Sequence, residues 1–257
     1  MFFFYLAVLF FFGTLLGSFL NVCICRLPRG ESVLWPRSHC RQCKHPIPLR
    51  ENVPVLSYIF LGGKCSTCHS PIPVTSPLVE ILTGGLLVAV LWHCGFSLSF
   101  LHYSILILFL LPISFIDLDT NLILNILTFP GMLAGLLLSF VVGHVAPLQA
   151  MLGLILGGGF LFLVRLLGAF LFEREGMGAG DVKLGAMIGV FLGPKVVVAL
   201  VLAFFLAVPV IAVGFSMKKL HSGSKLPFGP FISLGAVILI YFGPTPFTYY
   251  FELVRDL

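Results

Sequence analysis

Long apolar runs separated by short polar stretches dominate the sequence. A helix needs about 20 apolar residues to cross the hydrocarbon core of a bilayer. The first such run covers 2–24, and a polar stretch follows at 26–76. Seven more runs lie near 78–95, 98–116, 122–143, 147–171, 182–193, 195–217 and 228–246, of which 182–193 is the shortest and is rich in glycine. The pattern predicts an all-α polytopic membrane protein with about eight transmembrane helices and one small extramembrane loop.

Composition supports lipid as the solvent of this chain. Hydrophobic residues make up 59% of the 257 residues and charged residues only 10%, whereas soluble domains carry about 25% charged residues. The mean hydropathy is +1.10. The first basic residue, Arg26, follows the first apolar run, so we expect a retained helix and not a cleaved signal peptide, which would start with a basic segment. No internal repeat is evident.

The net charge of +5 indicates membrane orientation and not a nucleic-acid partner, because the basic residues flank apolar runs and form no stripe. Loops rich in Lys and Arg stay in the cytoplasm. The polar stretch holds seven: Arg26, Arg29, Arg37, Arg41, Lys44, Arg50 and Lys64. If it is cytoplasmic, eight alternating spans place 117–121, 172–181 and 218–227 on the same side, with Arg174, Lys183, Lys218, Lys219 and Lys225. The opposite side then receives only Lys195 and Arg255, and both termini lie outside.

This orientation predicts three parts. They are a first transmembrane helix at 1–25, a cytoplasmic metal-binding loop at 26–76 and a transmembrane domain at 77–257.

The polar loop contains two Cys-x-x-Cys pairs, and this spacing is typical of a zinc ribbon. Four thiolates, from Cys40, Cys43, Cys65 and Cys68, complete a tetrahedral shell of the kind that Zn2+ prefers. The alternative is two disulfides, which a reducing cytoplasm disfavours. A loop of this size builds little hydrophobic core, so a structural zinc ion would supply its folding free energy.

Acidic residues at the ends of apolar runs are the second candidate chemistry, because charges near a bilayer core are costly and usually functional. Asp117 and Asp119 end the third run, and Asp181 opens the sixth after Gly176, Gly178 and Gly180. In the predicted topology they meet at one membrane face. Two close carboxylates share a proton, so one can activate water while the other donates a hydrogen bond to a peptide carbonyl. The glycines would let a substrate strand approach the backbone closely.

Other interpretations of these acids stay open on the residues alone. Acids at span ends are often only solvated, and an ion or solute carrier also buries acids. The glycines also resemble a nucleotide loop, but no βαβ context precedes them.

Ordered motifs along nearly the whole chain resemble the bacterial type IV prepilin peptidases, which are G-x-G-D membrane aspartic proteases. The resemblance includes Gly17-Ser18-Phe19-Leu20-Asn21-Val22, Arg26-Leu27-Pro28, both cysteine pairs, Glu51-Asn52-Val53-Pro54, Gly62-Gly63-Lys64-Cys65, Pro77-Leu78-Val79-Glu80, Ile116-Asp117-Leu118-Asp119, Gly176-Met177-Gly178-Ala179-Gly180-Asp181-Val182-Lys183 and Pro227-Phe228-Gly229-Pro230.

The resemblance implies a bifunctional enzyme of the bacterial inner membrane, with its active site on the cytoplasmic side. Asp117 and Asp181 would be catalytic, with Asp119, Gly178, Gly180 and Lys183 in support. The substrates would be type IV prepilins or pseudopilins, whose short basic leader is cleaved. The new N-terminal residue would then be methylated from S-adenosylmethionine, and the candidates for methyl transfer are Glu51, Gly63, Lys64 and Glu80.

The sequence departs from the family pattern in one place. Family members usually carry proline and aspartate shortly after the first catalytic motif, whereas this chain has Leu124 and Asn125. Two alternatives to the family fit less well. A zinc-bearing carrier would need discontinuous helices in matching halves, and presenilin-like proteases carry Tyr-Asp and Pro-Ala-Leu motifs and lack the cysteine loop.

Overall fold

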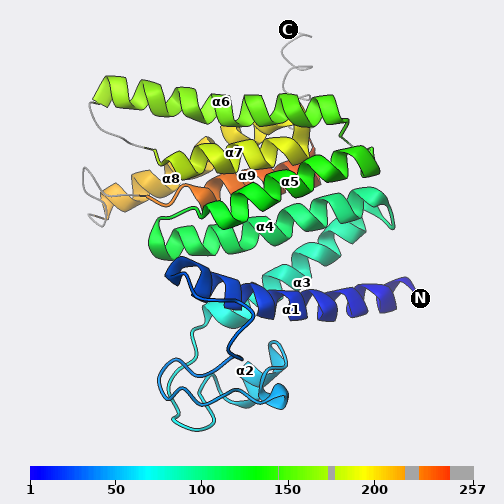
Figure 1. Cartoon of the computed structure of the whole chain (residues 1–257), viewed down its shortest axis with the longest axis vertical. Helices are drawn as coiled ribbons and strands as arrows, with labels where there is room; N and C mark the ends of the chain where they lie inside the picture. The colour runs from blue at the N-terminus through cyan, green and yellow to red at the C-terminus, as the bar shows by residue number, and fades with distance from the viewer. Residues whose placement is uncertain (144, 173–176, 218–225, 244–257) are drawn as a thin grey trace. The chain divides into compact units, whose positions relative to one another are not determined.

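The computed structural model describes residues 1–143, 145–172, 177–217 and 226–243 (Figure 1). It divides into two compact units, which we call the N-terminal unit (Met1–Phe96) and the C-terminal unit (Ser97–Leu257). Several positions used for the predicted orientation or motif lie outside the described residues. They are Arg174, Gly176, Lys218, Lys219, Lys225 and Arg255. The predicted division into 1–25, 26–76 and 77–257 follows membrane location and not compactness, so it stays a prediction.

Within the described residues, every predicted apolar run forms a helix and no strand is present, which confirms the all-α expectation. The long helices are α1 (Phe2–Arg26), α3 (Thr75–Cys94), α4 (Leu98–Thr120), α5 (Asn125–Val142), α6 (Pro147–Phe172), α7 (Ala179–Leu192), α8 (Val196–Ser216) and α9 (Gly229–Phe242).

Six segments of the described chain are long and apolar enough to cross a membrane. The last of them, Ala179–Gly214, joins α7 and α8 through the short 3-10 helix η3 (Gly193–Lys195). The helix α9 is apolar but has only 14 residues. The chain is therefore a multi-pass membrane protein by length and composition.

In the N-terminal unit, α1 and α3 form an antiparallel pair because small residues let their backbones approach. An added Cβ at Gly13 would lie 2.7 Å from Cα of Gly84, and one at Gly17 would lie 2.6 Å from Cα of Glu80. The chain between the two helices contains η1 (Leu27–Arg29), η2 (Leu49–Glu51) and the short helix α2 (Leu56–Phe60). The two helices therefore form a hairpin, and residues 27–74 form the long loop that connects them.

In the C-terminal unit, α7 is the central helix. Every residue from 184 to 192 is buried, as expected for a helix that is apolar all round and surrounded by others. The core of this unit combines residues of α4, α6, α7, α8 and α9, including Leu110, Ile113, Leu161, Leu184, Met187, Phe191, Leu200, Ile232 and Ala236. This packing fixes the first turn of α7, which carries Asp181.

Glycines bring α6 and α7 into backbone contact, and the two helices run side by side (Figure 1). A Cβ at Gly153 would meet the carbonyl oxygen of Gly189, and one at Gly157 would meet that of Gly185. Small residues spaced by four on both helices are the usual means of close helix approach in membranes.

We expect Gly157→Leu to lower the free energy of unfolding by about 3 kcal/mol, because a larger side chain must push the two helices apart. Unfolding in mixed detergent micelles, followed by helical circular dichroism, measures the loss. The matched control is Gly159→Leu in the same helix, where an added Cβ meets nothing within 4 Å. Equal losses in both variants would contradict the close-contact explanation.

Candidate active site

The structure brings together the two aspartates that the sequence predicts to be catalytic. Asp117 lies near the end of α4 and Asp181 in the first turn of α7. Their side chains are only 4% and 8% exposed. They lie close enough for the charge of Asp117 to act on Asp181. Two acids far apart in sequence therefore share one buried site in the C-terminal unit.

Each carboxylate accepts a hydrogen bond from a glycine N–H at the start of a helix. Gly229, the first residue of α9, donates its N–H to Oδ2 of Asp117 at 2.8 Å. Gly178, which precedes α7, donates its N–H to Oδ2 of Asp181 at 3.1 Å. The first N–H groups of a helix have no partner within it, so these donors are available to fix the carboxylates.

Two glycines at the site have no room for a side chain. A Cβ at Gly229 would lie 2.8 Å from Oδ2 of Asp117. A Cβ at Gly180 would lie 2.7 Å from Cβ of Ile123, in the turn between α4 and α5. Within the G-x-G-D motif, Gly178 thus holds the carboxylate, and Gly180 lets the start of α7 pack on the turn that follows Asp117.

Two residues predicted to support catalysis, Asp119 and Lys183, differ in their surroundings. Asp119 is exposed, two residues after the buried Asp117. Lys183 donates a hydrogen bond to Oδ1 of Asn125 at 2.8 Å, and its ammonium lies 5.7 Å from the centre of the Phe129 ring. Asn125, which stands where the family usually has aspartate, therefore keeps a polar contact with Lys183 through a neutral amide.

The geometry of this pair suits acid–base chemistry on a peptide. Buried carboxylates that interact cannot both ionise cheaply, and such a pair acts as one acid and one base.

The four predicted metal ligands of the N-terminal unit also converge. All four sulfurs lie within 4.8 Å of one another. Sγ of Cys40 lies 3.7 Å from that of Cys68, and Sγ of Cys43 lies 4.0 Å from that of Cys65. A tetrahedral site with Zn–S bonds of about 2.3 Å has sulfur–sulfur separations of about 3.8 Å. The four sulfurs are not paired in disulfides, and their separations fit one metal ion.

Nearby hydrogen-bond donors prepare the cluster for a cation. The backbone N–H of Cys43 and the hydroxyl of Ser70 lower the pKa of the Cys40 thiol to about 6. The backbone N–H of His45 lowers the pKa of Cys43, but desolvation and the three neighbouring thiols outweigh it and raise that pKa to about 11. Contact with Ser70 also lowers the pKa of Cys68. Since metals bind the thiolate and not the thiol, these contacts favour the metal-binding form of Cys40 and Cys68.

The two cysteine pairs belong to an internal repeat that the expectation from sequence missed. The stretches 40–48 and 65–73 both read Cys-x-x-Cys-x-x-Pro-Ile-Pro. Each folds into the same turn, closed by an antiparallel bridge, His39 with Pro46 and Lys64 with Pro71. The residue after the second cysteine has a positive φ in both, 59° at Lys44 and 56° at His69. The repeated Pro-Ile-Pro was the available signal.

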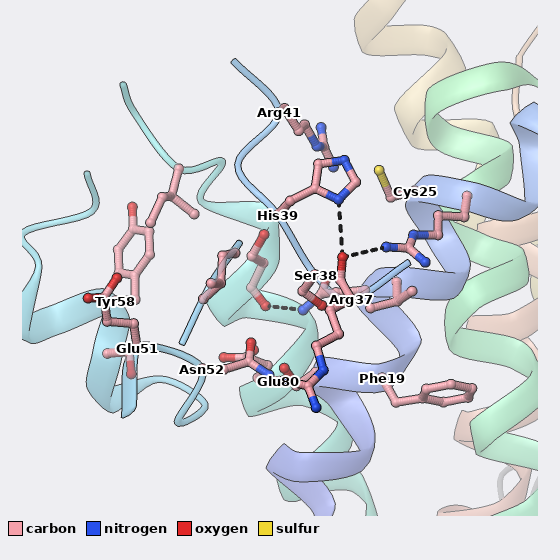
Figure 2. Close-up of a pocket in the computed structure, with 18 of the residues that line it drawn as sticks. Phe19, Cys25, Arg37, Ser38, His39, Arg41, Glu51, Asn52, Tyr58 and Glu80 are labelled. Atoms are coloured by element: carbon pink, nitrogen blue, oxygen red, sulfur yellow. Dashed lines mark hydrogen bonds between the residues drawn. The ribbon is translucent and has the colours of Figure 1, made fainter. Parts of the chain in front are cut away.

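A cavity of about 850 Å³ lies in the N-terminal unit, between the end of α1, the loop and the start of α3. Two of the predicted methyl-transfer residues, Glu51 and Glu80, line it, and Figure 2 shows them with Tyr58, Asn52 and Arg37. Glu51 accepts a hydrogen bond from the Ser66 hydroxyl at 2.7 Å. A concave site of this volume is sufficient for a small-molecule ligand.

The other two predicted methyl-transfer residues, Gly63 and Lys64, are not among the lining residues. Gly63 has φ +69°, and a Cβ there would lie 3.0 Å from the Tyr58 hydroxyl. It therefore supports a ring that faces the cavity. Lys64 is exposed and takes part in the second cysteine turn.

Sequence reasoning also missed Arg26 as a cavity residue. This side chain is only 7% exposed and donates hydrogen bonds to the carbonyl oxygens of Ser32 at 2.9 Å and Arg37 at 3.4 Å. The His39 ring donates to the same Arg37 carbonyl at 3.1 Å (Figure 2). A basic residue directly after an apolar helix indicates which end of the helix is cytoplasmic. Nothing in the position of Arg26 in the sequence indicated that its side chain is buried.

Two family models cover most of the chain. The bacterial Peptidase A24 N-terminal domain matches residues 11–94, and the type IV leader peptidase family matches residues 104–216. The boundary between the matches lies close to the boundary between the two structural units.

Three relatives illustrate the similarity. One from Myxococcus xanthus is 42% identical over 184 residues, which cover 72% of this chain and 55% of the relative. One from Aeromonas hydrophila is 35% identical over 93% of this chain and 91% of the relative. One from Neisseria gonorrhoeae is 34% identical over 88% of this chain and 87% of the relative. All three are named prepilin leader peptidase/N-methyltransferase. No solved structure is a significant match.

Proposed function

The chain belongs to the type IV leader peptidase family, and we propose that it cleaves the leader of type IV prepilins or pseudopilins and methylates the new N-terminus. The observation that carries the proposal is the convergence of Asp117 and Asp181 in one buried site. Relatives that match nearly the whole length of this chain are named for both activities. The carrier alternative has no counterpart among these names.

The two aspartates perform the cleavage. The ionised carboxylate takes a proton from a water molecule, and the resulting nucleophile attacks the carbonyl carbon of the scissile bond. The protonated carboxyl donates a hydrogen bond to the carbonyl oxygen and stabilises the charge that develops there. The glycine N–H groups of Gly178 and Gly229 keep one oxygen of each carboxylate fixed, which leaves the other oxygen for water and substrate.

The active site faces the cytoplasmic side of the bacterial inner membrane in this proposal. The charge pattern of the loop at 26–76 supports that orientation. Helices α7 and α9 have 14 residues each, so each is about 21 Å long. A hydrocarbon core of about 30 Å exceeds that length, and a site at the N-terminal ends of both helices can therefore lie below the membrane surface.

The four-cysteine cluster would hold a structural Zn2+ through Cys40, Cys43, Cys65 and Cys68. The sulfur–sulfur separations and the donors around Cys40 support this assignment. The ion would fix the loop on which Glu51 and His39 stand and takes no part in the cleavage.

Methyl transfer belongs to the cavity of the N-terminal unit in this proposal. S-adenosylmethionine supplies an electrophilic methyl group when bound. The free α-amine of the processed substrate would take up this methyl group and release a proton, and the neutral thioether would be the other product. Glu51 and Glu80 line the cavity, and Gly63 and Lys64 stand on the turn that supports Tyr58. The charged side chains among the lining residues suit a charged donor.

The test is a reaction of the purified full-length protein, in detergent, with a prepilin and S-adenosylmethionine. Mass spectrometry reads the loss of the leader and the addition of a methyl group in one spectrum. We expect both changes on the same product. A protein that never shortens the prepilin would overturn the peptidase assignment, and a shortened product without added mass would overturn methyl transfer alone.

We expect Gly229→Ala to lower the rate of leader cleavage by about a hundredfold, because the added methyl group displaces Asp117 and small misplacements at an active site cost that much. Single-turnover cleavage of a prepilin measures the rate. The control is Gly168→Ala in α6, where an added Cβ meets nothing within 4 Å. Unchanged cleavage in Gly229→Ala would show that the contact with Asp117 does not set the geometry of the site.

A further inference from the structure

Glu80 is a buried acid at the cavity of the N-terminal unit. It lies in the second turn of α3, its side chain is 8% exposed, and it lines the cavity. Burial of an ionised carboxylate costs several kcal/mol unless another charge compensates it. The environment of Glu80 therefore decides what the cavity can bind.

All hydrogen-bond partners of Glu80 among the described residues are neutral. Its Oε2 accepts the N–H of Val55 at 2.8 Å, and Ser18 and Asn21 of α1 supply the other contacts. These donors solvate the carboxylate but leave its net charge in place. Arg26 is the buried basic residue in the cavity lining, and it donates to two backbone carbonyls instead. The other arginines and lysines in the lining are exposed: Arg29, Arg37, Arg41 and Lys44.

Strain at Val55 points to a function for this arrangement. Val55 has φ +61° and ψ −51°, which is a costly conformation for a β-branched residue. It stands directly before α2, the helix that brings Tyr58 to the cavity. Glu80 accepts the Val55 N–H and so holds this conformation. Strain of this kind persists where the surroundings fix it for binding or catalysis.

We propose that the Glu80 carboxylate is the counter-charge for an organic cation bound in the cavity of the N-terminal unit. The inference rests on the proposed methyl transfer, which brings two such cations to one place: the sulfonium of the methyl donor and the α-ammonium of the processed substrate. During the transfer, positive charge leaves sulfur and appears on nitrogen. A fixed carboxylate beside either atom compensates that charge.

The test compares ligands that differ only in this charge. Equilibrium dialysis of the zinc-loaded full-length protein in detergent gives the dissociation constants of S-adenosylmethionine and of S-adenosylhomocysteine, its neutral thioether. Methylation kinetics give the KM of a peptide with the processed N-terminus. The variant is Glu80→Gln, whose amide oxygen still accepts the Val55 N–H. The matched control is Glu31→Gln, which removes the same charge from an exposed acid that also lines the cavity, so it changes the net charge of the cavity without removing the buried carboxylate.

Two results support the proposal and separate the sources of the cation. If Glu80 faces the sulfonium, Glu80→Gln weakens S-adenosylmethionine binding by about tenfold or more and changes S-adenosylhomocysteine binding by less than about twofold. If it faces the ammonium, both dissociation constants stay the same and the KM of the peptide rises by about tenfold or more.

Other results overturn it. No change beyond about twofold in any of these constants, or an equal loss in Glu31→Gln, would exclude Glu80 as the counter-charge. A wild-type protein that methylates nothing would instead refute the proposed methyl transfer on which the inference rests.

A second measurement covers the case in which Glu80→Gln loses zinc and fails to fold. The wild-type protein should then prefer S-adenosylmethionine over S-adenosylhomocysteine, or the free-amine peptide over its N-acetylated form, by about tenfold. Equal binding within both pairs would also overturn the proposal.

Discussion

Asp117→Asn and Asp181→Asn should each lower the rate of leader cleavage by about a thousandfold or more, because an amide can neither take a proton from water nor share one with its neighbour. Asparagine has the shape of aspartate, and its carbonyl oxygen still accepts the N–H of Gly229 or Gly178. The change therefore removes the chemistry and keeps the packing. Single-turnover cleavage of a prepilin, read by mass spectrometry, measures each rate.

The matched control is Asp119→Asn. Asp119 lies on the same helix and carries the same charge, but it is exposed. We expect this variant to retain most of the wild-type rate. If all three variants cleave alike, the pair is not the catalytic centre, and a loss confined to Asp119→Asn would move the centre to the exposed acid.

Removal of the metal from the four-cysteine cluster should unfold the loop and abolish binding of the methyl donor, while leader cleavage continues. Zinc contributes about 10–16 kcal/mol to the folding of small zinc-binding peptides, which is more than the few contacts of this loop supply. The residues that line the cavity include His39, Arg41 and Lys44 of the first cysteine turn. The aspartate pair belongs to the other structural unit.

Cys40→Ser tests this prediction, with Cys94→Ser in α3 as the control outside the cluster. Bound zinc per protein, limited proteolysis within 27–74 and equilibrium dialysis of S-adenosylmethionine are measured for each variant. A loop that resists protease equally with and without a strong chelator would show that the metal does not hold it together.

Features set by the bilayer could be predicted from the sequence. Membrane spans must be helical because lipid offers no hydrogen bonds to the backbone. Each predicted apolar run therefore corresponds to a helix in the described residues. The ends differ where polar residues continue a helix. The helix α4 runs on through Asp117 to Thr120, whereas the predicted span stopped at 116.

The candidate site could be predicted as a set of residues but not as a set of contacts. The positions of Asp117 and Asp181 beside predicted spans indicated that they meet, and the cysteine spacing indicated a cluster. The donor to Asp117 is Gly229, 112 residues away in sequence, and no local pattern reveals such a pair. The contact of Lys183 with Asn125 is equally non-local. The conformation of Val55 depends on Glu80, so tertiary contacts override its local preference.

The antiparallel pairing of α1 with α3 has a consequence for how far the chain can be shortened. Gly13 faces Gly84 and Gly17 faces Glu80, so the two helices pack directly on each other along their length. A connection of 2–5 residues is enough to close such a pair. The stretch from 27 to 74 can then be replaced by such a short connection without breaking the contact between the two helices. A protein shortened in this way should retain its membrane hairpin and its peptidase and lack only the second activity.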